Sequence, residues 1–176
     1  MNKHKFLITL VCLLVVYACR PDKTLEQDTT QEWGKEHSVD FNQEVNEREQ
    51  LEIAAFLRHH HYLKMDTTAS GLRYMIYKKS TENKVKTGDE VLVQIKIERL
   101  DGAICYQTDS ISGSEIIKIG KSEVESGIQE GLKLMRIGEQ AKLILPSYLA
   151  HGLLGDRYTV PPQAILYVDI KLLNKK

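Results

Sequence analysis

Residues 148–162, "YLAHGLLGDRYTVPP", are the stretch of sequence that decides the fold. They lie between two strongly strand-like runs, "EQAKLILP" (139–146) and "QAILYVDIKLL" (163–173). A glycine-rich connection of this length is long for a structural turn, and Pro161-Pro162 stiffens its return to the second run. We therefore interpret it as a loop that frames a site.

The N-terminus has the features of a lipoprotein-type secretory signal. Lys3 and Lys5 precede an apolar run over residues 6–16, and "VYAC" (16–19) resembles a bacterial lipobox that ends at Cys19. We predict a signal peptide over residues 1–18, lipidation of Cys19 and a polar tether over residues 19–37. An ordinary N-terminal anchor helix is the alternative.

Charge and cysteine content exclude several classes of function and stabilisation. Lys plus Arg and Asp plus Glu both number 24, so the chain has no excess of basic residues that would favour binding of nucleic acid. Cys12 leaves with the predicted signal and Cys19 is acylated, so Cys105 is the single remaining thiol and cannot form an internal disulfide. No His is close to Cys105 in sequence, which favours a small buried hydrophobe over a nucleophile.

The rest of the chain predicts an α+β fold. An apolar stripe with helical spacing, which includes Val45, Leu51 and Ile53, predicts an N-terminal helix over residues 38–66, in which the charged residues of "EREQLE" (47–52) are read as a solvated face. Alternating apolar residues predict an antiparallel sheet of about five strands, and Asp101-Gly102 predicts a hairpin turn. One short helix, over about residues 123–137, is expected to pack on that sheet.

Three motifs in this order resemble FKBP-type peptidyl-prolyl isomerases. They are "GDEVLVQIKIERLDG" (88–102), "EVESGIQEGLKLMRIGEQAKLILP" (123–146) and "YLAHGLLGDRYTVPPQAILYVDIKLL" (148–173). "SGLRY" (70–74) also resembles the first strand of exported bacterial members. The resemblance implies an FKBP-like antiparallel sheet wrapped on one short helix over residues 67–176, with no metal and no cofactor. A lipidated member of this size further resembles the gliding-motility-associated isomerases of Bacteroidetes.

The resemblance also implies an apolar cup for a proline ring. Val124 and Val160 match the family, and the backbone N–H of Glu125 is expected to donate to the substrate carbonyl. The other implied positions differ from the family: Ile95 for Tyr, Cys105 for Phe, Tyr106 for Asp, Ile128 for the Trp floor, His151 for the loop Tyr and Val168 for Phe. The cup is therefore expected to be aliphatic and the isomerase weak, unless a register shift brings Tyr106 in as an aromatic wall.

The expected function is isomerisation of X-Pro bonds in exported polypeptides at the cell envelope, facing the periplasm. The alternative is a non-catalytic interaction or chaperone module of a motility or secretion machine. The helix over residues 38–66 either packs on its own domain or forms a homodimer. His59, His60 and His61 point in three directions on a helix, which favours a solvated helix end over a metal site.

Overall fold

The computed structural model describes residues 34–108, 113–121 and 123–176. Its internal contacts divide the chain into Met1–His37 and Ser38–Lys176, and the second unit carries the fold. The predicted signal peptide, the lipidation of Cys19 and most of the predicted tether lie outside the described residues. Within the described ranges, no helix has the length and apolar character needed to cross a membrane.

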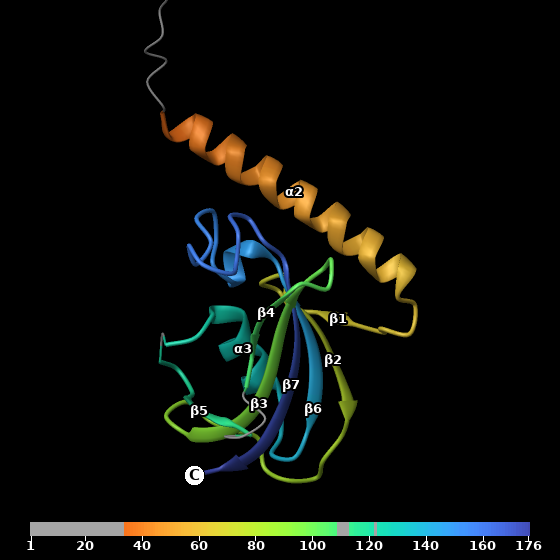
Figure 1. Cartoon of the computed structure of the whole chain (residues 1–176), viewed down its shortest axis with the longest axis vertical. Helices are drawn as coiled ribbons and strands as arrows, with labels where there is room; N and C mark the ends of the chain where they lie inside the picture. Colours follow the sequence, from red (N-terminus) through yellow and green to blue (C-terminus); the bar gives the residue numbers. More distant parts are fainter. Residues whose placement is uncertain (1–33, 109–112, 122) are drawn as a thin grey trace, which may run out of the picture. The chain divides into compact units, whose positions relative to one another are not determined.

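The strands that the structure describes form one seven-stranded antiparallel sheet. Its order is β1-β2-β6-β7-β3-β4, with β5 also paired to β3 (Figure 1). The bounds are β1 Asp66–Thr67, β2 Arg73–Lys78, β3 Glu90–Arg99, β4 Ile104–Gln107, β5 Glu115–Lys118, β6 Gln140–Leu145 and β7 Leu166–Lys175. Four of these strands, β2, β3, β6 and β7, are six or more residues long, and the short strands lie at the margins.

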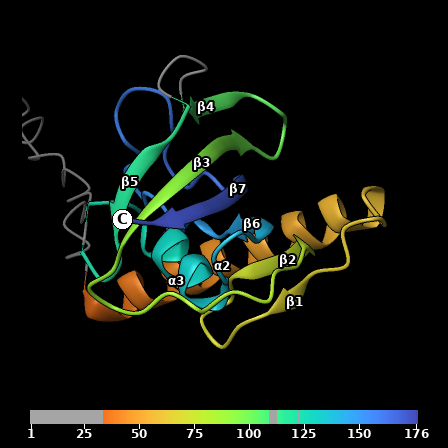
Figure 2. The same ribbon diagram turned by 90° about the horizontal axis from the view of Figure 1, so that it is seen from below.

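Helix α3, Ser126–Leu134, packs against the sheet (Figures 1 and 2). Two buried glycines allow a close approach, since a Cβ on Gly131 would lie 2.5 Å from Leu143 Cδ1 on β6. Alternate residues of β3 point into the resulting core, as the period of a strand requires. The predicted α+β class, with a sheet over one short helix, is confirmed.

Helix α2, Lys35–His59, packs on the same domain from Ser38 onward. Its Ile53 is 1% exposed and forms a small second core with Ile144 and Ile165. The helix ends at His59, earlier than the predicted boundary at residue 66, because Asp66–Thr67 must be extended to pair with β2. At its other end it includes the last residues of the predicted tether, 35–37.

The prediction that residues 47–52 form a solvated face is wrong at one position. Glu49 is 1% exposed, because it lies four residues from both Val45 and Ile53 and so shares their buried row on the helix. Its neighbour Leu51, predicted on the apolar stripe, is 72% exposed. The periodicity located the helix but misassigned part of its buried face.

Candidate functional site

A pocket of about 350 Å³ lies between β3, β4, the start of α3 and the loop after β6. Eight of the nine residues predicted for the proline cup line it: Ile95, Cys105, Tyr106, Val124, Glu125, Ile128, His151 and Val160. The ninth, Val168, is fully buried on β7 and belongs to the main core. The structure thus brings most of the predicted set together, and the catalytic roles of these residues stay predictions.

The pocket has an aliphatic floor. Ile95 and Ile97 lie on the same face of β3, and Ile128 lies in the first turn of α3. Their exposed fractions are 3%, 5% and 1%, so the floor consists of core side chains that are shielded from water. An apolar ring bound here loses water without having to displace polar groups.

A β-bulge brings two consecutive residues of β4 to the pocket. Ile97 pairs with Tyr106, but the next residue of β3, Glu98, pairs with Ile104, so Cys105 is the extra residue. Strand alternation alone would send Cys105 and Tyr106 to opposite faces. The bulge lets both side chains line the pocket, and it supplies the aromatic wall that the sequence made conditional on a register shift.

The Tyr106 wall is fixed by a hydrogen bond. Its hydroxyl donates to Glu115 Oε2 over 2.6 Å, and this bond, with partial burial and the nearby charge, raises the pKa of Tyr106 to about 12. The phenol therefore stays protonated at neutral pH. Tyr106 presents ring surface to the pocket while its polar end is satisfied.

Cys105 is half-buried, and its Sγ lies 3.8 Å from the carbonyl oxygens of Ala103 and Thr159. Burial raises the pKa of the thiol, so the nucleophilic thiolate is disfavoured. The environment is that of a small apolar residue with a weak S–H donor.

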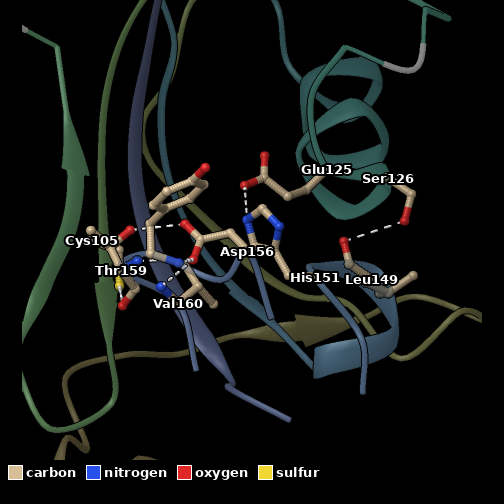
Figure 3. A network of polar contacts seen from close by, with 9 residues as sticks. Cys105, Glu125, Ser126, Leu149, His151, Asp156, Thr159 and Val160 are labelled. Atoms are coloured by element: carbon tan, nitrogen blue, oxygen red, sulfur yellow. Dashed lines mark hydrogen bonds and ion pairs between the residues drawn. The ribbon is translucent and has the colours of Figure 1, made fainter. Parts of the chain in front are cut away.

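The polar side of the pocket is a pair formed by His151 and Glu125. His151 Nε2 lies 2.9 Å from Glu125 Oε1, and the two side chains are 30% and 13% exposed (Figure 3). Glu125 is the residue that caps α3, and its carbonyl accepts hydrogen bonds from Ile128 N and Gln129 N. Its own backbone N–H makes no hydrogen bond to any residue that the structure describes. That N–H is free to donate to a bound carbonyl at the positive end of the helix.

Asp156 holds the loop that forms the far wall. Its carboxylate accepts from the backbone N–H groups of Tyr158, Thr159 and Val160 at 2.8, 2.9 and 2.7 Å, and from the Thr159 hydroxyl at 2.9 Å (Figure 3). These bonds lower the pKa of Asp156 to about 2. The turn keeps Val160 in the pocket wall, at the position that the family resemblance implies.

Four lining residues were not predicted: Ile97, Glu115, Asp156 and Thr159. Ile97 could have been found, because it is two residues from Ile95 and therefore on the same face of the strand. Nothing in the local sequence marks the other three, whose positions depend on β5 and on the path of the loop.

The three consecutive histidines lie at the end of α2. Their Nδ1 atoms lie 2.8, 2.8 and 3.1 Å from the carbonyl oxygens of Ala55, Phe56 and Arg58, respectively. Across the described part of the chain, no group of three His, Cys, Asp or Glu residues is arranged to hold a metal ion.

Solved structures with the same fold include a peptidyl-prolyl cis-trans isomerase from Pseudomonas syringae, with a TM-score of 0.63 and 21% identity. That match covers 76% of this chain and 95% of the solved one. The crystal structure of AtFKBP13 has a TM-score of 0.60 and 20% identity over 64% of this chain and 99% of its own, and the two neighbours show the FKBP-like fold that the sequence predicted.

Curated relatives match over about half of this chain. Peptidyl-prolyl cis-trans isomerase FKBP10 from mouse is 32% identical over 91 residues, which are 52% of this chain and 16% of the relative. The FKBP-type isomerase FkpA from Aeromonas hydrophila is 35% identical over 107 residues, 61% of this chain and 39% of the relative. The chain therefore spans well under half the length of these relatives.

The profile of FKBP-type peptidyl-prolyl cis-trans isomerases matches residues 81–173, which include every residue that lines the pocket. This chain belongs to the FKBP-type peptidyl-prolyl cis-trans isomerase family.

Proposed function

We propose that this protein catalyses cis-trans isomerisation of X-Pro bonds in exported polypeptides. The observation that carries the proposal is a pocket with an aliphatic floor next to the backbone N–H of Glu125, which bonds to none of the residues that the structure describes. Its family, and the presence of eight of the nine predicted positions in one cavity, support the proposal.

The chemistry needs neither a nucleophile nor a metal. The barrier to rotation about an X-Pro bond is about 20 kcal/mol and arises from amide resonance. A pocket that surrounds the proline ring with aliphatic surface disfavours the polar planar amide over the twisted one. A donor that holds the carbonyl of the twisted form better than that of either ground state lowers the barrier further.

Each group of the pocket has a role in this scheme. Ile95, Ile97 and Ile128 bury the ring, and Tyr106 closes one side. The N–H of Glu125 donates to the carbonyl of the residue before or after the proline. With both ring nitrogens protonated, His151 keeps its Nε2–H on Glu125 and donates a second hydrogen bond from Nδ1, in place of the hydroxyl that the family resemblance leads one to expect.

We expect the activity to be weak. Aliphatic side chains bury apolar area as well as aromatic ones do, but each lost aromatic contact removes about 0.5–1.5 kcal/mol. With one aromatic side chain among the residues described around the pocket, several such contacts are lost. A rate an order of magnitude below that of an aromatic pocket is the expected result.

The proposal includes a location at the cell envelope. The lipobox-like "VYAC" and the preceding apolar run support a chain anchored by lipid at Cys19 and facing the periplasm, where exported proteins fold. Likeness to the gliding-motility-associated isomerases suggests clients among motility or secretion proteins. Labelling cells with a radioactive fatty acid and comparing the chain with Cys19→Ala tests the anchor: no label on the parent chain contradicts it.

A protease-coupled assay on a short Ala-Leu-Pro peptide tests the activity. The proposal predicts a rate above background that rises in proportion to protein concentration and falls when Ile128 is changed to Asp. Conversion at the uncatalysed rate contradicts it.

One observation favours a second function, that of a non-catalytic binding module. The floor positions Ile95 and Ile128 are aliphatic, and the family's catalytic pocket is expected to be aromatic. A groove of this kind still binds an extended proline-containing segment. Measurable binding of the same peptide without acceleration of its isomerisation is the result that selects this function.

A further inference from the structure

Glu49 of α2 is a buried carboxylate outside the pocket. It is 1% exposed, and its Oε2 accepts a hydrogen bond from the backbone N–H of Ser147 over 2.8 Å. Its Oε1 is also buried and has no partner among the described residues. A buried oxygen without a partner lowers stability, and an apolar side chain would fill the row between Val45 and Ile53 without that cost. Packing alone does not account for this side chain.

The Ser147 peptide connects Glu49 to the pocket. Ser147 begins the short 3₁₀ helix Ser147–Leu149, whose N-cap, Pro146, makes no side-chain cap bond. The carbonyl of Ser147 accepts from the N–H groups of Ala150 and Gly152, at 2.9 and 2.8 Å. These two residues flank His151. Glu49 therefore bonds the N–H of Ser147, and the C=O of Ser147 bonds the residues on both sides of His151.

A second contact from α2 reaches the same segment. The guanidinium of Arg48 donates to the side-chain oxygen of Gln163, and the N–H of Gln163 donates to the carbonyl of Gly152 over 3.0 Å. Two consecutive residues of α2 thus hold the backbone next to His151 from opposite ends of the loop. The hydrogen bond between Gln50 and Arg73 on β2 does not involve this loop.

We propose that Glu49 is a positioning residue of the isomerase site, which acts on the reaction through Ser147 and His151. The inference rests on the proposed isomerase function. In this role α2 belongs to the functional site, because the helix fixes the orientation of the His151 side chain relative to Glu125 and the bound peptide. Positioning of this kind matters because hydrogen bonds in a site lose much of their effect when displaced by a fraction of an ångström.

A double-mutant cycle in the full chain tests the inference. Glu49→Ala is expected to lower kcat/KM about three- to tenfold in the parent chain. In the His151→Ala background the same change is expected to have no further effect, since the group that it positions is gone. Glu49→Gln, which keeps an oxygen for the Ser147 N–H, is expected to recover most of the loss. Gln50→Ala is the matched control: it removes an α2–domain hydrogen bond at β2 and leaves the rate unchanged.

Amide hydrogen exchange supplies a readout that does not depend on activity. Glu49→Ala is expected to speed exchange of the Ala150 and Gly152 amides about tenfold, and Gln50→Ala to leave them as they are. Parent-like rate and exchange in Glu49→Ala would overturn the inference, as would an equal loss of rate in both backgrounds. A parent chain that does not accelerate isomerisation of the peptide refutes the proposed function itself. An active parent chain whose rate is unchanged by Glu49→Ala refutes only the positioning role.

Discussion

His151 Nε2 and Glu125 Oε1 lie 2.9 Å apart and join the loop after β6 to the N-cap residue of α3. The bond places an imidazole on the rim of an aliphatic pocket, beside the Glu125 N–H, which bonds to none of the described residues. Both donors therefore depend on one residue, through its backbone and its side chain. The predictions below test this arrangement and the loop that supports it.

His151→Ala is expected to lower kcat/KM about five- to tenfold, because one hydrogen bond contributes about 1 kcal/mol. The free energy of unfolding is expected to change by less, since His151 is partly exposed and lies in a loop. A protease-coupled assay and urea unfolding measure the two quantities. Losses of rate and stability in the same proportion would contradict a role in catalysis.

His151→Ala also leaves the Glu125 carboxylate without its partner, and the effect of this unpaired charge must be separated from the effect of losing the imidazole. Adding Glu125→Gln removes the charge and keeps the backbone N–H. The double variant is expected to match His151→Ala. Recovery of the parent rate would attribute the loss to the unpaired carboxylate.

Gly155→Ala is expected to lower the free energy of unfolding by at least about 2 kcal/mol. Gly155 has φ +67°, and a Cβ there would collide with the carbonyl oxygen of Val160. Gly152→Ala is the matched control, because its φ is +64° but nothing lies within 4 Å of the added carbon. The control should lose only the cost of a left-handed residue, about 1 kcal/mol. Equal losses in the two variants would exclude the close approach at Gly155.

Asp156 is expected to make loop order dependent on pH at the acidic end. Its pKa falls from 3.8 to about 2 in the folded protein, because backbone N–H groups and Thr159 bond the charged form. Its contribution is complete above about pH 4 and is lost as pH falls through about 2. A carbon-13 titration of its carboxyl group should show a midpoint near 2, with the Val160 amide shifting in parallel. In Asp156→Asn that shift of the Val160 amide should disappear; a carboxyl midpoint near 3.8 contradicts the turn.

Much of the fold could be predicted from the sequence because it follows from periodicity. Alternating apolar residues over 91–97 locate β3, and the motif order located the loop with Val160 in its wall. The bulge at Cys105 could not be found this way, since it exists only in the pairing of β4 with β3.

The burial of Glu49 and its contact with the loop also could not be predicted from the sequence. Its local sequence is charged and looks solvated, yet its partner, Ser147, lies 98 residues further along the chain. The one available signal was its spacing of four from Val45 and Ile53. A contact that depends on how two distant segments dock leaves little trace in either segment alone.

We expect the strength of the proposed activity to depend on Tyr106. Tyr106→Ala removes the aromatic wall, and we expect kcat/KM to fall about three- to tenfold, in line with about 0.5–1.5 kcal/mol for one aromatic contact. Tyr106→Phe loses the hydroxyl bond to Glu115 but keeps the ring, so it should retain at least about half of the rate. Tyr158→Ala is the control, because Tyr158 is 94% exposed in the loop after β6 and does not line the pocket. If the Phe variant loses as much as the Ala variant, the hydroxyl and Glu115 matter to catalysis, and the ring is not the part of Tyr106 that the reaction uses.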